Sequence, residues 1–194
     1  MWLVVGLGNP GPEYARTRHN VGFMAVERLL DRWKAPAMKE KFSGVWSRAA
    51  VGAEEAVLLC PLTYMNLSGE SAQKAMAFFK IPVSTVVVIH DEMDVPFGEV
   101  RVKVGGGAAG HNGLKSMIQH AGADFVRVRI GIGRPARGTQ ESWVLGSFDP
   151  VSSAQLPDVL HAAALATEAV VKDGPAAAQN RTNAKPKPPK AGKE

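Results

Sequence analysis

The fold class follows from Thr85-Val86-Val87-Val88-Ile89 and from the residues after it, His90-Asp91-Glu92-Met93-Asp94. The first part is rich in β-branched residues on both faces, which is typical of a strand covered on both sides of a sheet. In open α/β sheets, reactive groups gather at the carboxyl ends of such strands. The segment therefore predicts an α/β fold and marks Asp91 as a candidate functional residue.

The rest of the chain alternates strands with helices. An apolar run from Trp2 to Leu7, closed by the loop residues 8–12, predicts a second central strand. Periodicity predicts further strands at 42–46, 56–59, 100–104 and 125–132, and helices at 21–33, 68–79, 114–120 and 153–172. This order indicates a single-domain three-layer α/β sandwich with a mixed, mostly parallel sheet flanked by helices. The strands at 100–104 and 125–132 are candidates for antiparallel members.

The length of 194 residues corresponds to about one domain. We expect that domain to span residues 1–183. In the remaining segment, 184–194, residues 185–190 are only lysine and proline and offer nothing apolar to bury, so we expect this tail to be disordered.

The formal net charge of +5 is unevenly distributed. Residues 181–194 hold five basic side chains and one acidic one, whereas residues 96–140 hold seven basic side chains and two acidic ones. Phosphate binding depends on cations gathered on one surface more than on net charge. The segment 96–140 is therefore a candidate nucleic-acid contact.

Cysteine content and hydropathy predict a cytoplasmic protein. Cys60 is the only cysteine, so no intrachain disulfide can form. Met1 to Gly6 lacks the basic segment and the length of a signal peptide. No apolar run approaches the roughly 20 residues of a membrane helix, so membrane association is not expected.

Two short motifs are rejected as functional signals. Gly6 to Gly11 matches the glycine pattern of dinucleotide-binding loops, but Pro10 and Pro12 remove the backbone donors that a pyrophosphate needs. Ser71 and Lys74 match a serine acyl-enzyme pattern of four common residues without its companion motifs.

Seven polar residues stand where a strand or loop meets the next element: Asn9, His19, Asn20, Asn66, Asp91, His111 and Asn112. Individually, Asn66 and Asn112 are candidate helix caps, and Asn9 is a candidate turn residue. Together they predict a site, because amides can hold a carbonyl oxygen and a histidine near an aspartate can take a proton from water.

A metal site is an alternative reading of some of these residues. The set His90, Asp91, Asp94 and His111 has the ligand types of zinc, manganese or iron sites, although its spacing is not diagnostic. A metal-dependent hydrolase remains open on this reading. A non-catalytic RNA-binding module is a second alternative, since it would share the basic strands without needing His19 beside Asp91.

Six longer motifs carry a resemblance to a known family. They are GLGNPGPEY at 6–14, TRHNVG at 17–22, TYMNLSG at 63–69, HDEMDVPFG at 90–98, GGGAAGHNGL at 105–114 and FVRVRIGIGRP at 125–135. In order and spacing they resemble the bacterial-type peptidyl-tRNA hydrolases, over roughly Leu3 to Asn183. Residues Ala108 and Ala109 depart from the family pattern, which usually has glycine or a polar residue there.

The resemblance implies hydrolysis of the ester that joins a peptide to the 3′ end of tRNA, with release of free tRNA and peptide. It implies that His19 is the general base and that Asp91 orients it. Asn9, Asn66 and Asn112 would position the peptide and the ester, with Asn9 as the candidate for selecting N-blocked substrates. Tyr14 and Tyr64 would meet the tRNA 3′ end, and no metal or cofactor is implied.

The basic strands supply the expected tRNA contacts. We expect Arg101 and Lys103 to meet phosphates, together with Lys115 in the helix after the glycine loop. Arg127 and Arg129 are either further contacts or structural partners of carboxylates. We expect the protein to act as a monomer.

Overall fold

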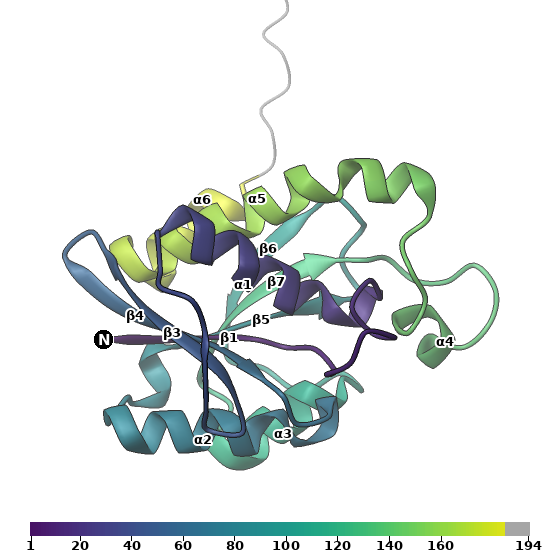
Figure 1. The fold of residues 1–194 in the computed structure, drawn as a ribbon. Coiled ribbons are helices and arrows are strands. Elements are labelled where there is room, and N and C mark those ends of the chain that lie inside the picture. The colour runs from purple at the N-terminus through teal and green to yellow at the C-terminus, as the bar shows by residue number, and fades with distance from the viewer. Residues whose placement is uncertain (185–194) are drawn as a thin grey trace, which may run out of the picture.

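The computed structural model describes residues 1–184. Within this range the strands are β1 (Trp2–Gly6), β2 (Lys39–Lys41), β3 (Gly44–Val51), β4 (Glu54–Pro61), β5 (Val86–Glu92), β6 (Val100–Val104) and β7 (Val126–Gly131) (Figure 1). The α-helices are α1 (Val21–Arg32), α2 (Ser68–Phe79), α3 (Asn112–Ala121), α4 (Gln140–Val144), α5 (Pro150–Asp173) and α6 (Pro175–Thr182). Three short 3-10 turns are η1 (Arg18–Asn20), η2 (Met65–Leu67) and η3 (Val83–Thr85).

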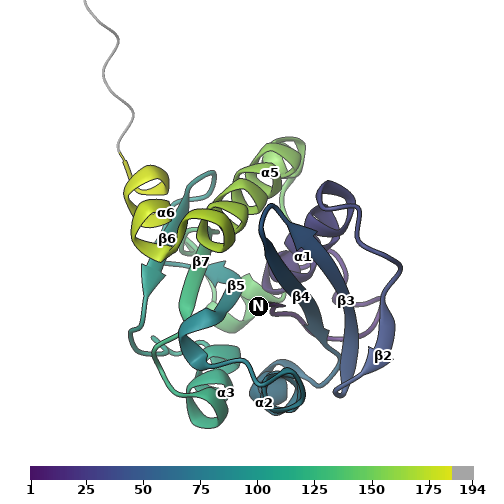
Figure 2. The ribbon, with the colours of Figure 1, turned by 90° about the vertical axis from the view of Figure 1, so that its left-hand side faces the viewer.

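The strands form one mixed sheet in the order β2-β3-β4-β1-β5-β7-β6. The four central strands are parallel, and Val4 of β1 pairs with Leu58 on one side and Val87 on the other. Both outer parts of the sheet are antiparallel, through β3 with β4 and β6 with β7. Helices α1, α5 and α6 cover one face, and α2 and α3 cover the other (Figure 2). The predicted mixed α/β sandwich is confirmed.

Burial on both faces holds the central strands in place. Val4 packs into the core under α1 and α5, whereas Leu3 and Val5 pack into the core on the α2 and α3 side. All three side chains are fully buried, and burying each contributes about 1.5–3 kcal/mol of hydrophobic free energy. The carboxyl ends of β1 and β5 are therefore rigid supports for the residues that follow them.

Several boundaries differ from the prediction. The strand predicted at 42–46 begins only at Gly44, because Phe42 and Ser43 have positive φ angles in the turn between β2 and β3. The predicted helix at 153–172 begins earlier, at Pro150, where the Asp149 carboxylate accepts the Ser152 N–H (2.9 Å). Helix α5 ends at Asp173 with Gly174 as its C-cap, and the short helix α6 begins directly afterwards at Pro175, since proline suits the first position of a helix. The prediction for the tail lies outside the described residues, except for Ala184.

Both edges of the sheet are protected from further strand pairing. At the β6 edge, the Asn183 side chain donates to the Val102 carbonyl (2.8 Å) and accepts the Val102 N–H (2.9 Å). At the other edge, β2 is a strand of three exposed residues, Lys39, Glu40 and Lys41. Short charged strands are poor templates for pairing.

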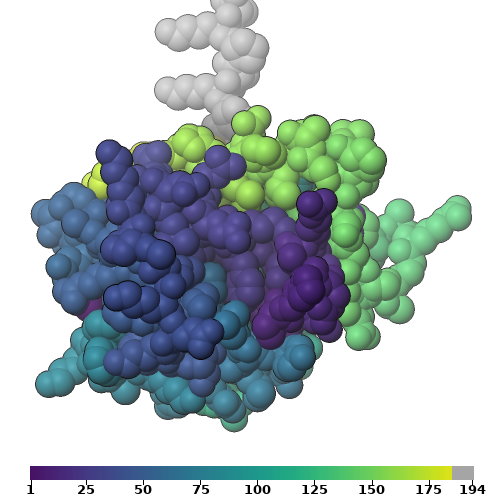
Figure 3. All heavy atoms as spheres, viewed as in Figure 1, coloured from purple at the N-terminus to yellow at the C-terminus, as the bar shows by residue number. Residues whose placement is uncertain are grey.

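One close approach brings the start of α1 to the carboxyl ends of the central strands. A Cβ atom on Gly22 would stand 2.5 Å from both the Ile89 carbonyl oxygen and the Leu7 nitrogen, so only glycine fits there. This packing sets η1 beside the end of β5. In the space-filling view, the purple N-terminal loop lies beside the green segment that follows β7 (Figure 3). Among residues 1–184, no helix is long and apolar enough to cross a membrane.

Candidate active site

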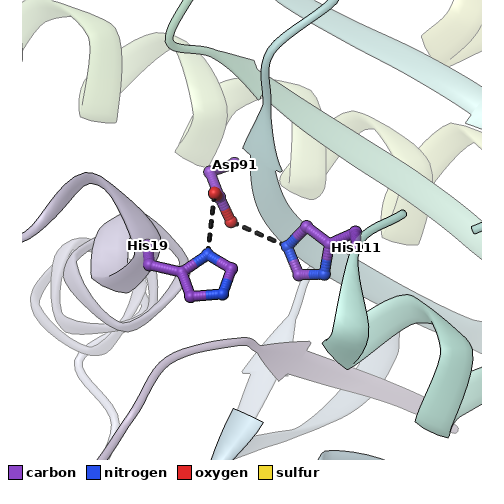
Figure 4. A group of neighbouring side chains, drawn as sticks. All are labelled: His19, Asp91 and His111. Atoms are coloured by element: carbon purple, nitrogen blue, oxygen red, sulfur yellow. Dashed lines mark hydrogen bonds and ion pairs between the residues drawn. The ribbon is translucent and has the colours of Figure 1, made fainter. Parts of the chain in front are cut away.

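Three side chains from distant parts of the chain meet at the carboxyl end of β5 (Figure 4). His19 comes from η1, Asp91 from β5, and His111 from the residue that precedes α3. The Asp91 carboxylate lies between the two imidazoles, with Oδ2 at 2.8 Å from His19 Nδ1 and Oδ1 at 2.8 Å from His111 Nε2. We call these three residues the histidine–aspartate group.

The hydrogen bonds fix the tautomer of each imidazole. His111 Nδ1 accepts the backbone N–H groups of Gly113 (3.1 Å) and Leu114 (3.3 Å), so this nitrogen carries no proton. His111 Nε2–H therefore donates to Asp91. His19 Nδ1–H donates to the other carboxylate oxygen, which leaves His19 Nε2 with a free lone pair. That is the tautomer a general base requires.

The site keeps Asp91 charged and its neighbour His90 neutral. Burial raises the pKa of Asp91, but His111 and His19 outweigh it, and the pKa lies well below its usual range. Complete burial lowers the pKa of His90 to about 3. The neutral His90 ring lies 2.8 Å from the Asp91 carbonyl oxygen, to which its Nδ1–H donates. Asp91 is thus a fixed carboxylate that can stabilise a positive charge on His19.

The group opens into a cavity of about 700 Å³. Most residues predicted for the site line this cavity: Asn9, Tyr14, His19, Tyr64, Asn66, Asp91 and Asn112. Asn20 instead supports the wall, because its amide exchanges two hydrogen bonds of 2.9 Å with the Asn9 backbone. The helix-cap roles considered for Asn66 and Asn112 are not found, since the cap of α3 is the His111 ring and α2 has no side-chain cap.

The orientation of Asn9 is set by its neighbours. Its Oδ1 accepts the Met65 N–H at 2.8 Å. The oxygen is therefore committed to the protein, and among residues 1–184 no hydrogen bond engages Nδ2. Because Asn9 lines the cavity, this Nδ2–H₂ group is a donor available to a bound carbonyl oxygen.

Arg101 and Lys103 do not line the cavity. They lie on β6 opposite Arg129 and Arg127 of β7, so the four side chains share one face of the sheet, which we call the basic face. Arg127 donates to the carbonyls of Gly106 and Gly107, and Arg129 lies 3.5 Å from Glu92. Arg101 pairs with Glu99, whereas Lys103 is exposed and forms no ion pair within residues 1–184. Lys115 is also exposed, on α3.

The four residues considered as metal ligands, His90, Asp91, Asp94 and His111, do not come together as one ligand set. Asp94 is exposed and binds Arg134, and His90 donates to the Asp91 backbone. Candidate ligand atoms of His19, Asp91 and His111 do lie within 4.8 Å of one another. However, a metal on His111 Nε2 would require either an imidazolate or a proton on Nδ1, where two N–H groups already point. The donor set suits proton transfer better than metal binding.

Sequence reasoning placed His111 in the polar set and among the candidate metal ligands, but gave it no role beside His19 and Asp91. The structure shows that it is the second donor to Asp91. Its signal was local: a histidine directly before a helix has its ring near free backbone N–H groups. Sequence reasoning also missed α4, which contributes Gln140, Glu141 and Val144 to the cavity wall.

Comparisons with known proteins agree with this geometry. The model of the family described as "Peptidyl-tRNA hydrolase" matches residues 3–190. The peptidyl-tRNA hydrolase of Sorangium cellulosum is 55% identical over 194 residues, covering 98% of this chain and 87% of that protein. That of Geobacter sulfurreducens is 51% identical over 159 residues, covering 81% of this chain and 82% of that protein.

A solved structure gives the same result. The crystal structure of peptidyl-tRNA hydrolase from Acinetobacter baumannii superposes with a TM-score of 0.88 at 39% identity, covering 95% of both chains. The family match spans nearly the whole chain, and the fold and the relatives point the same way. This chain therefore belongs to the peptidyl-tRNA hydrolase family.

Proposed function

We propose that this protein hydrolyses the ester bond between a peptide and the 3′ end of tRNA, releasing free tRNA and peptide. The observation that carries the proposal is the pairing of His19 with the buried Asp91 carboxylate at the cavity that Asn9 lines. Family membership supports the substrate class. We also propose that the protein acts as a monomer, and that it acts in the cytoplasm, where translation supplies this substrate.

His19 is the general base in this mechanism. Its Nε2 takes a proton from water, the water oxygen attacks the ester carbonyl carbon, and a tetrahedral oxyanion forms. When the carbon–oxygen bond to the ribose breaks, the proton passes from His19 to the ribose oxygen. A positioned base contributes about 10²–10⁴-fold to such a reaction.

Asp91 and His111 prepare His19 for this role. Asp91 holds the imidazole in the tautomer with a free Nε2 and stabilises the imidazolium that forms during the reaction. His111 binds the second carboxylate oxygen and thereby fixes the orientation of Asp91. Proton transfer in the proposed mechanism requires only these side chains and water.

The asparagines select and orient the substrate. The Asn9 Nδ2–H₂ group donates to a carbonyl oxygen of the peptide, and Asn66 and Asn112 hold the ester region. An N-blocked residue offers a neutral amide here, whereas free aminoacyl-tRNA would bring an ammonium that must lose its water. The site thereby favours peptidyl over aminoacyl esters.

The tRNA contacts both the cavity wall and the surface beyond it. Tyr64 is 58% exposed at the cavity wall and, with Tyr14, offers rings on which the 3′-terminal bases stack. Arg101, Lys103 and Lys115 contact phosphates. Binding should therefore weaken steeply as salt rises.

The direct test is incubation of the purified protein with N-acetyl-aminoacyl-tRNA in the presence of a chelator, with release of free tRNA as the readout. We expect release by the wild type and none above background by His19→Ala, which still binds tRNA. His161→Ala is the matched control, since His161 is an exposed histidine on α5. Activity lost to the chelator would favour a metal-dependent hydrolase, and tRNA binding without release by the wild type would favour a binding module.

A further inference from the structure

Helix α4 forms one wall of the cavity but has little packing of its own. None of its five residues is buried, and it lies beyond the ends of the strands, away from the helices that cover the sheet (Figure 1). Glu141 and Val144, together with Leu145 just after the helix, nevertheless line the cavity. The position of this wall must therefore come from a few specific contacts.

Arg18 makes the most direct of these contacts. Its guanidinium carbon lies 3.5 Å from the centroid of the Trp143 ring, and its Nη1–H donates to the Trp143 carbonyl at 3.1 Å. The Trp143 indole N–H donates in turn to the Gly133 carbonyl at 2.9 Å. Arg18 is only 6% exposed and Trp143 is half-buried, so the guanidinium side of the stack is shielded from water.

Backbone contacts reinforce the same junction. Thr17 and Ser147 form an isolated antiparallel bridge, and the Arg18 N–H donates to the Gly146 carbonyl at 3.0 Å. A Cβ atom on Gly146 would stand 2.9 Å from Arg18 Nη1, so a glycine there leaves room for the guanidinium. The turn that carries His19 and the end of α4 are thus joined by side-chain and main-chain contacts.

The charge of Arg18 is balanced in an unusual way. Within residues 1–184, no carboxylate lies within ion-pair distance of its guanidinium. The face of an indole ring is electron-rich and attracts a planar guanidinium, and this attraction strengthens when water is excluded. The Trp143 ring is therefore the main partner of the cation, and the second ring nearby, Phe148, is 5.6 Å away.

We infer that Arg18 is a positioning residue for the peptide part of the substrate. Because Arg18 and His19 are neighbours in η1, the stack on Trp143 sets the α4 wall at a defined place relative to the catalytic imidazole. This inference rests on the proposed function. The wall suits a peptide rather than tRNA, because residues 140–145 include the acidic Glu141 and no cation, so phosphates are disfavoured there.

The test compares Arg18→Lys and Trp143→Leu with the wild type on two substrates, N-acetyl-aminoacyl-tRNA and an N-acetyl-tripeptidyl-tRNA. For both variants we expect KM for the tripeptidyl substrate to rise about tenfold, as lost stacking and hydrogen bonding imply. KM for the shorter substrate should rise less than about threefold on the same reasoning, because its peptide part barely reaches the wall. The pH profile of kcat should stay as in the wild type, because the contacts of His19 with Asp91 are kept.

Two further variants separate positioning from general stability. Trp143→Phe retains an aromatic face and should restore most of the wild-type KM. Arg16→Lys is the matched control, because Arg16 is an exposed arginine in the same loop. The double variant Arg18→Lys/Trp143→Leu should raise KM no further than either single change, since both remove the same contact.

Some results would overturn the inference. KM values that rise equally for the two substrates would assign Arg18 a merely structural role, and KM values unchanged for both would remove its role altogether. If Arg18→Lys fails to fold, Trp143→Leu decides, because its side chain is on a helix with no buried residue. Failure of the proposed function is distinguishable, since the wild type itself would then release no tRNA.

Discussion

The histidine–aspartate group and the basic face are built in different ways. The first joins three residues from η1, β5 and the start of α3 through two hydrogen bonds of 2.8 Å to the buried Asp91 carboxylate. The second follows from simple alternation along two paired strands, and Lys103 in it is exposed. Chemistry therefore depends on a few atoms in one arrangement, whereas the proposed tRNA binding is spread over several replaceable charges. Substitutions should have large effects in the first region and small, salt-dependent effects in the second.

The largest effect is expected at the carboxylate that both imidazoles share. Asp91→Asn should lower kcat by about 10²–10⁴-fold, because an amide cannot accept both N–H groups or stabilise the imidazolium. The affinity for tRNA should change little. Single-turnover hydrolysis and filter binding measure the two quantities, and a variant with near wild-type kcat would remove Asp91 from the mechanism.

The next effect concerns how the thermal stability of the protein depends on pH. Complete burial lowers the pKa of His90 from 6.5 to about 3, so between these values the unfolded chain binds more protons than the folded protein. This contribution is fully present above pH 6.5 and is lost as the pH falls toward 3. The wild-type Tm should therefore drop by about 10 °C between pH 7 and pH 4.

The matched variant for this prediction is His90→Gln, which removes the titrating group but keeps a donor for the Asp91 carbonyl. Its Tm should fall less steeply over the same pH range, whatever its value at pH 7. Thermal melts followed by circular dichroism give both slopes. Equal slopes would mean that the titration of His90 does not cause the fall in Tm between pH 7 and pH 4.

In the cavity beside the histidine–aspartate group, Asn9 should control substrate choice. Asn9→Ala removes the donor and should reduce the preference for N-acetyl-aminoacyl-tRNA over aminoacyl-tRNA by about 10–100-fold. Asn9→Asp keeps the acceptor for the Met65 N–H and adds a charge that attracts the ammonium, so the preference should fall further. An unchanged ratio of kcat/KM values in both variants would refute the assignment.

The basic face should respond more weakly. Lys103→Ala should raise KM about threefold and reduce the slope of log KM against log salt by about 1, as expected for one lost phosphate contact. Lys39→Ala, an exposed lysine on β2, is the control and should leave both values unchanged. A wild-type salt slope in Lys103→Ala would place the tRNA elsewhere.

The smallest effect is expected at Ala109, a cavity-lining residue in the glycine loop with a φ angle of 48°. This left-handed conformation costs alanine about 1 kcal/mol, which glycine does not incur. Ala109→Gly should therefore raise Tm by at most about 2–4 °C. A lower Tm would show that the entropy of glycine in the unfolded chain outweighs the relieved strain.

Much of this architecture could be predicted from the sequence, because the spacing of apolar residues in the central strands and main helices is regular. The gathering of His19 and Asp91, 72 residues apart, in one site was expected because junctions between elements tend to share one edge of the sheet, whereas their roles as base and orienting carboxylate came from the family resemblance. The second hydrogen bond to Asp91 was harder to foresee, since it depends on Gly113 and Leu114 taking the other nitrogen of His111. Helix α4 escaped prediction because five residues are too few to show a helical period.

The amide of Asn183 has a consequence for how the molecule meets others of its kind. By satisfying both main-chain groups of Val102, it takes the place of a strand that a second copy would otherwise supply. A variant truncated before Asn183 would leave the N–H and the carbonyl of Val102 unpaired at the sheet edge, and we expect it to self-associate. Asn183, near the end of the described residues, thus limits self-association at this edge as well as holding α6 against β6.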